Sequence, residues 1–146
     1  MSDVVIEISS EDETIAFARE FSKKLSAGDI VLLHGDLGMG KSVFARACIR
    51  FLCSADDLEV PSPTFTLVQT YDADLCLVWH FDLYRLSDAS EIYEIGWEEA
   101  LSSKGIIFVE WSERLGDLIP LSYIDVTLSP VLGAENKRKI KVVRYG

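Results

Sequence analysis

One segment, Gly35 to Ser42, constrains the fold of this chain more than any other. Its sequence, GDLGMGKS, matches the pattern G-x-x-x-x-G-K-[ST] at every fixed position. The apolar run Ile30 to Leu33 precedes it and is typical of a strand buried on both faces of a parallel sheet. Apolar residues at helical spacing over residues 41–52 predict a helix directly after it. A buried strand, a glycine-rich turn and a helix in this order predict a loop that binds nucleotide phosphates.

Each fixed position of this segment has a physical task in holding phosphate groups. The glycines let backbone N–H groups turn towards the phosphates, and the start of the following helix adds unpaired amides and a positive dipole end. Lys41 can reach the β- and γ-phosphates, and the Ser42 hydroxyl can ligate Mg²⁺. Asp36 is expected to shape the turn rather than take part in chemistry. The predicted nucleotide contacts are Gly35, Asp36, Leu37, Gly38, Met39, Gly40, Lys41 and Ser42.

A phosphate site that uses a metal ion also needs a carboxylate near Ser42. In a parallel sheet, ligands collect at the carboxyl ends of the strands. Two acidic residues meet this condition, because Asp82 ends the run Leu77 to Phe81 and Glu110 ends the run Ile106 to Val109. Either carboxylate could hold Mg²⁺ or orient an attacking water. The alternative is a solvated acid at a strand end, without a role in chemistry.

The rest of the chain continues the alternation of strands and helices. Ser10 with Glu13 predicts the start of a helix, and Gly28 its end. Further strands are expected at 4–8, 65–71, 75–84, 105–111, 123–128 and 139–144, with a helical segment at 88–102 that is interrupted at Gly96. The pattern predicts an α/β fold like that of P-loop nucleoside triphosphatases, with a mostly parallel central sheet, flanking helices and antiparallel hairpin additions. No repeat or linker interrupts it, so residues 1–146 are expected to form a single domain.

The charge balance limits the partners of the chain. It has 14 lysines and arginines against 24 aspartates and glutamates, a net charge of −10. Direct binding of nucleic acid normally needs a basic face, so it is not expected.

No apolar run approaches the roughly 20 residues that cross a bilayer, and the N-terminus lacks the pattern of a signal peptide. With three cysteines that cannot all pair, these features predict a cytoplasmic protein with reduced thiols.

Four segments together resemble the TsaE (YjeE) family of small bacterial ATPases. They are the glycine-rich loop, SPTFTLV at 62–68, HFDLYRL at 80–86 and VEW at 109–111, in order and at similar spacing over nearly the whole chain. The loop alone is generic, whereas the HFDLYRL segment is specific. Membership would imply a role in forming threonylcarbamoyladenosine, a modified nucleoside beside the tRNA anticodon.

The resemblance also implies a mechanism and partners. It implies a Mg²⁺-dependent ATPase that binds ATP or ADP, docks on the TsaB–TsaD pair and resets that pair between catalytic cycles, while contact with tRNA is left to the partners. It places Mg²⁺ at Ser42 and Glu110, and it gives Asp82 a role in hydrolysis. Lys41 would contact the phosphates. Thr64 falls in a switch-like loop. The region of relatives that approaches the base corresponds to Glu11, Thr14 and Arg138.

Two other classes of function stay open from the residues alone. A small-molecule kinase usually carries an arginine-rich lid over the transferred phosphate, whereas the seven arginines of this chain do not cluster in the sequence. A nucleotide-binding adaptor that never hydrolyses would tolerate the loss of both Asp82 and Glu110. Trp111, next to Glu110, is expected either to stack on the nucleotide or a partner, or to pack in the core.

Overall fold

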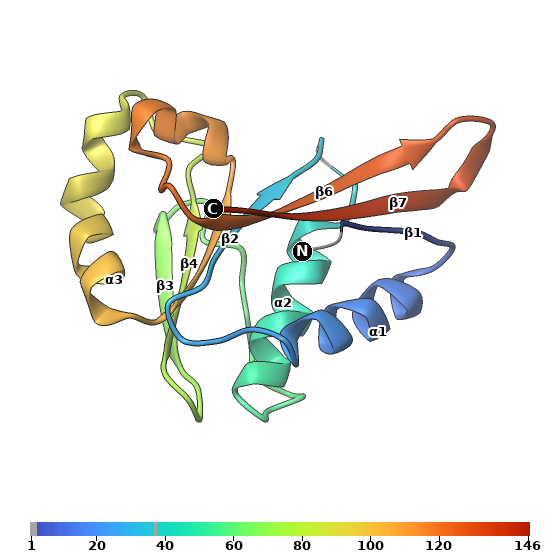
Figure 1. The fold of residues 1–146 in the computed structure, drawn as a ribbon, viewed down its shortest axis with the longest axis horizontal. Helices are drawn as coiled ribbons and strands as arrows, with labels where there is room; N and C mark the ends of the chain where they lie inside the picture. The colour runs from blue at the N-terminus through green and yellow to red at the C-terminus, as the bar shows by residue number, and fades with distance from the viewer. Residues whose placement is uncertain (1–2, 37) are drawn as a thin grey trace.

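A seven-stranded sheet lies at the centre of the molecule, and helices pack on both of its faces (Figure 1). The computed structural model describes residues 3–36 and 38–146. The elements in chain order are β1 (Val4–Ile8), α1 (Glu11–Ser22), β2 (Ile30–His34), α2 (Lys41–Leu52), β3 (Val68–Asp72), β4 (Leu77–Asp82), the 3₁₀ segment η1 (Ala89–Ile95), α3 (Trp97–Ser103), β5 (Ile106–Glu110), the 3₁₀ segment η2 (Ser112–Leu118), β6 (Tyr123–Val131) and β7 (Ala134–Tyr145).

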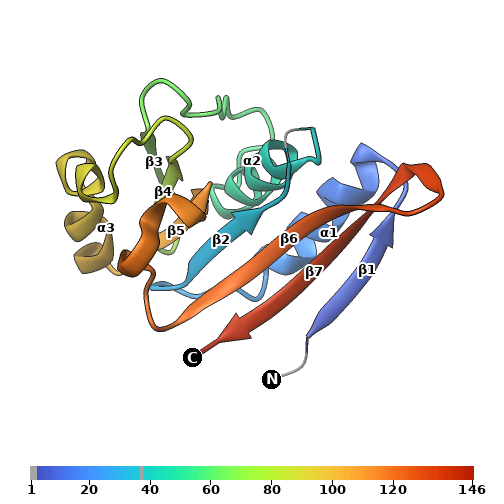
Figure 2. The ribbon, with the colours of Figure 1, turned by 90° about the horizontal axis from the view of Figure 1, so that it is seen from above.

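The sheet has a parallel centre and antiparallel edges. Its strand order is β1-β7-β6-β2-β5-β4-β3, and the pairs β6–β2, β2–β5 and β5–β4 are parallel. β3 is antiparallel to β4 at one edge, while β7 and β1 add antiparallel pairs at the other. Figure 2 shows the long β6–β7 hairpin with β1 alongside it. The predicted fold class is confirmed, with β6 as a direct neighbour of the strand that precedes the glycine-rich loop.

The core has two halves, one on each face of the sheet. Val31 and Leu33 of β2 face α1 and α2, whereas Ile30 and Leu32 face η1, α3 and η2. All four side chains are buried. The first four residues of β2 are therefore apolar because both faces of the strand are covered there, as the sequence predicts.

The two helices on the first face differ in how well the sequence predicts them. α2 has the predicted bounds, and α1 begins as expected, because the Ser10 side chain accepts a hydrogen bond from the Glu13 N–H. The predicted end of α1 at Gly28 is wrong: the helix ends at Ser22, and the Lys23 N–H bonds to the carbonyls of Arg19 and Phe21. Over residues 3–36 and 38–146, no helix has the length and apolar character needed to span a membrane.

His34 joins the end of β2 to two neighbouring elements. Its Nε2 is hydrogen-bonded to Asp125 of β6, and its Nδ1 lies 3.7 Å from the carboxylate of Glu113 in η2. The hydrogen bond to Asp125 is the largest cause that raises the pKa of His34 above its ordinary value of 6.5, against the opposing effect of burial. A histidine whose pKa is raised by folding stabilises the fold below its unfolded pKa, and this contribution is lost as pH rises through the folded pKa.

We therefore expect Asp125→Asn to lower the melting temperature more at about pH 6 than at about pH 8. At the lower pH the wild-type chain holds a protonated His34 against a carboxylate, and the variant lacks that carboxylate. Thermal unfolding of both proteins at both pH values measures the difference, with the exposed Asp117→Asn as control. A destabilisation that stays the same across this range would contradict the assignment.

Candidate phosphate-binding site

A cleft of about 430 Å³ opens at the carboxyl ends of β2, β4 and β5. This is the edge of a parallel sheet where ligands collect. Its lining residues come from the glycine-rich loop, the start of α2, the 61–66 segment and the strand ends: Asp36, Gly38, Gly40, Lys41, Ser42, Val43, Ser62, Thr64, Asp82, Tyr84, Glu110 and Trp111. The structure thus brings the predicted carboxylates and the predicted loop into one cavity.

The loop has a backbone that requires glycine at two places. Gly40 has φ of 100° and comes directly before α2, so the helix begins there without a side-chain cap. Gly35 has φ of 145°, and a Cβ at this position would lie 2.6 Å from the Leu128 carbonyl oxygen of β6. Met39 packs against the core rather than lining the cleft. The predicted contact at Leu37 lies outside the described residues.

Lys41 is buried in the cleft and is held by an aromatic ring. The residue is only 6% exposed, and its Nζ lies 4.0 Å from the centre of the Trp111 ring. Within the described part of the chain, no carboxylate forms an ion pair with it. A ring face attracts a cation but does not neutralise its charge. The Lys41 ammonium therefore remains a donor for an anion that enters the cleft.

Trp111 owes its position to an unusual backbone conformation. It follows the last residue of β5 and has φ of 60°, in the left-handed region that favours glycine. Its ring centre lies 4.8 Å from that of Tyr84. The turn places the indole over Lys41 in the cleft lining, and the ring also packs against the core on the η1, α3 and η2 side of the sheet. The structure thus shows core packing, while stacking on a nucleotide or a partner stays a prediction.

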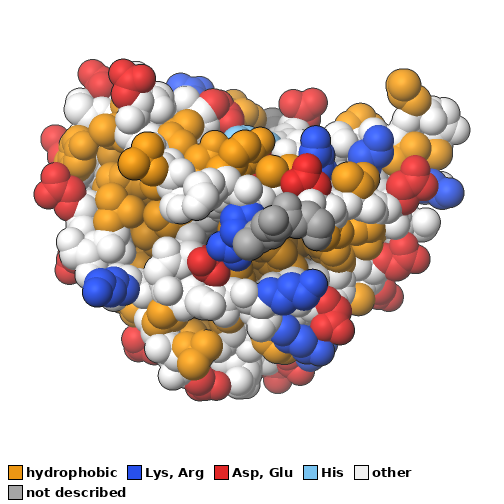
Figure 3. All heavy atoms as spheres, in the orientation of Figure 1, with side chains coloured by type: hydrophobic (Ala, Val, Ile, Leu, Met, Phe, Trp, Pro, Cys, Tyr) orange, Lys and Arg blue, Asp and Glu red, His pale blue; other side chains and the backbone are white. Residues whose placement is uncertain are grey.

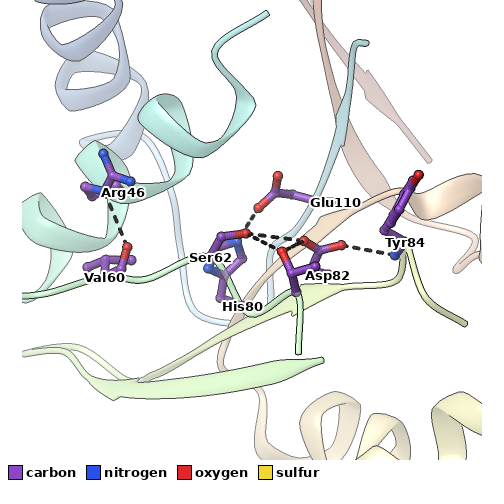
Figure 4. A network of polar contacts seen from close by, with 8 residues as sticks. Arg46, Val60, Ser62, His80, Asp82, Tyr84 and Glu110 are labelled. Atoms are coloured by element: carbon purple, nitrogen blue, oxygen red, sulfur yellow. Dashed lines mark hydrogen bonds and ion pairs between the residues drawn. The ribbon is translucent and has the colours of Figure 1, made fainter. Parts of the chain in front are cut away.

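Glu110 is oriented by a buried histidine. The His80 Nε2 donates to Glu110 Oε2 over 2.7 Å, and the two residues are 1% and 2% exposed. They lie on β4 and β5 and point to the α2 side of the sheet, as Figure 4 shows. One carboxylate oxygen is thus engaged by His80. The contact fixes the direction in which the Glu110 carboxylate meets the cleft.

Asp82 connects the sheet to the 61–66 segment. One of its oxygens accepts hydrogen bonds from the Ser62 and Thr64 hydroxyls, each at 3.3 Å, and the other accepts from the Tyr84 N–H at 3.0 Å. Asp82 is also the direct register partner of Glu110 on β5 (Figure 4). Two buried carboxylates therefore stand side by side on neighbouring strands, in the same cleft as the Ser42 hydroxyl. Carboxylate and hydroxyl oxygens form a donor set that suits Mg²⁺.

Two contacts of this cleft were missed by sequence reasoning. The His80–Glu110 pair depends on the register of β4 on β5, which local patterns do not specify. Ser62 lines the cleft beside Thr64. The sequence feature that indicates it is its place between Pro61 and Pro63 in a short, stiff loop.

The arginines are scattered in the sequence, but three of them come together in the folded chain. Arg19, Arg46 and Arg50 line one hollow between α1 and α2, because the two helices pack against each other. None of them lines the cleft, and neither does any other arginine of the described residues. The cleft therefore lacks the arginine-rich lid that is typical of small-molecule kinases.

The fold and the cleft define an α/β protein of the P-loop type. The family described as "Threonylcarbamoyl adenosine biosynthesis protein TsaE" matches residues 8–140. The tRNA threonylcarbamoyladenosine biosynthesis protein TsaE of Rickettsia bellii is 46% identical over 121 residues, 83% of this chain and 83% of its own length. Its namesake in Aquifex aeolicus is 35% identical over 144 residues, 99% and 97% of the two chains. This chain belongs to the TsaE family.

A solved structure supports the fold independently. The crystal structure of YdiB from Bacillus subtilis superposes with a TM-score of 0.81, covering 99% of this chain and 87% of that one. The two sequences are 22% identical. The likeness therefore concerns the arrangement of strands and helices.

Proposed function

We propose that this protein binds and hydrolyses ATP and acts as a partner-gated switch in the formation of threonylcarbamoyladenosine in tRNA. Membership of the TsaE family supports the pathway. One observation supports ATP binding and hydrolysis most directly. The glycine-rich loop lies in the same cleft as two buried carboxylates from neighbouring strands. Residues 1–146 would act as one ATPase domain in the cytoplasm.

The proposed roles follow from where each group lies. The loop amides and Lys41 would hold the phosphates, and Lys41 would leave the Trp111 ring for the more strongly attracting anion. Ser42 and Glu110 would hold Mg²⁺, which neutralises charge on the β- and γ-phosphates when bound. Asp82 would orient the attacking water.

The 61–66 segment is the proposed switch. Its Ser62 and Thr64 hydroxyls bond to Asp82 in the present structure. A γ-phosphate in the cleft would offer these hydroxyls a charged acceptor, so that ATP and ADP would hold the segment differently. We propose that the TsaB–TsaD pair senses this difference, and that tRNA meets the machine through those partners.

A smaller hollow of about 220 Å³ beside the loop supports a position for the base. Glu11 and Thr14 of α1 line it together with Arg138 of β7. Gly38, Met39 and Gly40 line the same hollow, so it adjoins the phosphate site. We propose that the adenine lies there, in the region that the family resemblance indicates.

Calorimetric titration of the purified chain with ADP, and with ATP and Mg²⁺, tests the binding part of this proposal. We expect one site per chain and competition between the two nucleotides. If neither ADP nor ATP binds, the proposal is contradicted. Binding without any hydrolysis, alone or with partners, would favour the adaptor alternative. Transfer of the γ-phosphate to a small acceptor would favour the kinase.

A further inference from the structure

Three arginines that are far apart in the sequence line one groove between α1 and α2. Arg19 comes from α1, and Arg46 and Arg50 come from α2. The hollow measures about 270 Å³ and continues past Arg19 and Arg50 into a second one, beside Lys23 and the exposed Leu75. Figure 3 shows Lys and Arg side chains, with acidic side chains beside them, on the part of the surface that α1 covers. The groove is thus locally basic in a chain with a net charge of −10.

Two of these arginines are anchored by backbone carbonyls and not by carboxylates. The Arg46 Nε donates to the Val60 carbonyl at 3.3 Å, and the Arg50 Nε donates to the Leu58 carbonyl at 2.8 Å. Over residues 3–36 and 38–146, no carboxylate forms an ion pair with either side chain, and the ion pair of Asp56 is with Arg19, at 3.8 Å. Each anchored guanidinium keeps its terminal nitrogens as a fork that suits a carboxylate or a phosphate.

The groove is connected to the phosphate-binding cleft through the backbone. Val60, which holds Arg46, lies two residues before Ser62, and Ser62 donates to Asp82 in the cleft. Figure 4 shows this continuous path from Arg46 to Asp82. Val43 lines both the groove and the cleft. A ligand that engages Arg46 therefore acts on the segment that we propose as the switch.

We propose that this groove is the docking site for an acidic segment of a protein partner. Ile15 and Phe51 lie among the arginines in the groove lining, so it offers contacts for apolar side chains between carboxylates. A nucleic-acid backbone would instead need a continuous basic face, and the chain's net charge of −10 repels an extended polyanion. Opposite charges on the two partners would set the orientation and speed of docking. This inference rests on the proposed function only in taking TsaB–TsaD as the partner.

The test compares Arg19→Glu with the matched control Lys24→Glu. Both residues are exposed, and neither variant disturbs the hydrogen bonds that anchor Arg46 and Arg50; Lys24 lies outside the groove. The probes are the purified TsaB–TsaD pair, a labelled synthetic peptide of alternating glutamate and leucine, and unmodified tRNA. We expect Arg19→Glu to weaken binding of the pair and the peptide about tenfold, with Lys24→Glu close to wild type. ADP affinity and melting temperature should be unchanged in both variants.

Other outcomes separate this inference from the proposed function. Equal weakening by both variants, or no weakening by either, would overturn the groove as a docking site. A wild-type chain that binds neither the pair nor the peptide would overturn it too. Peptide binding that depends on Arg19, without any binding of the pair, would support the groove and remove the proposed partner. Arg19-dependent binding of tRNA alone would overturn the assignment to a protein segment.

Discussion

Replacing Lys41 with alanine is expected to weaken the binding of ADP and ATP by about 10- to 100-fold, as a charge-assisted hydrogen bond of about 1.5–3 kcal/mol is lost. The Lys41 ammonium is buried at the mouth of the loop and lies over the Trp111 ring, without a carboxylate partner among the described residues. No other lysine or arginine lines the cleft in the described part of the chain. The variant therefore leaves the phosphates without a side-chain cation.

Calorimetry with ADP measures this loss directly. Lys24→Ala removes the same charge from an exposed site outside the cleft and is the matched control. Its affinity should equal that of the wild type. An unchanged ADP affinity in Lys41→Ala would defeat the assignment of Gly35–Ser42 as the phosphate loop.

Replacing Glu110 with glutamine is expected to reduce Mg²⁺-dependent ATP hydrolysis by about 100-fold and to leave metal-free ADP binding largely intact. Glutamine keeps the size of the side chain and an oxygen that accepts the hydrogen bond from His80. It removes the negative charge that would hold the metal beside Ser42. Since Glu110 is only 2% exposed, keeping its shape also protects the core strand β5.

Two controls make this result specific. Glu98→Gln changes the same group on the exposed side of α3 and should hydrolyse ATP like the wild type. Melting curves of Glu110→Gln show whether β5 still folds. Equal losses of hydrolysis and of metal-free ADP binding would indicate a damaged strand rather than a missing metal ligand.

The parts of the fold that were predicted are those with strong local signals. α2 was predicted with its bounds, because the glycines and lysine at its start and its helical spacing act within a few residues of one another. The end of α1 was predicted too late, since Gly28 lies in a turn beyond the helix and the chain leaves the helix at Ser22. The parallel pairing of β6 with β2 joins residues far apart in the sequence, and no local pattern encodes it.

In the candidate site too, local patterns predict some residues, whereas contacts between distant residues are not predictable from the sequence. Asp82 and Glu110 were found because a carboxylate at the end of an apolar strand is a readable pattern, and the register of β4 on β5 brings them together. The same register creates the His80–Glu110 pair, which the sequence does not reveal. The sequence does not indicate that three arginines share a groove, because Arg19 meets Arg46 and Arg50 only when α1 packs on α2.

Hydrolysis of ATP by the purified chain, alone and with the TsaB–TsaD pair, tests the central claim most directly. We expect slow Mg²⁺-dependent turnover by the chain alone and clear stimulation by the pair. This result would be expected if a docked partner changes the conformation of the 61–66 segment beside the cleft. Rapid turnover that is indifferent to the pair would contradict the account and indicate an independent substrate.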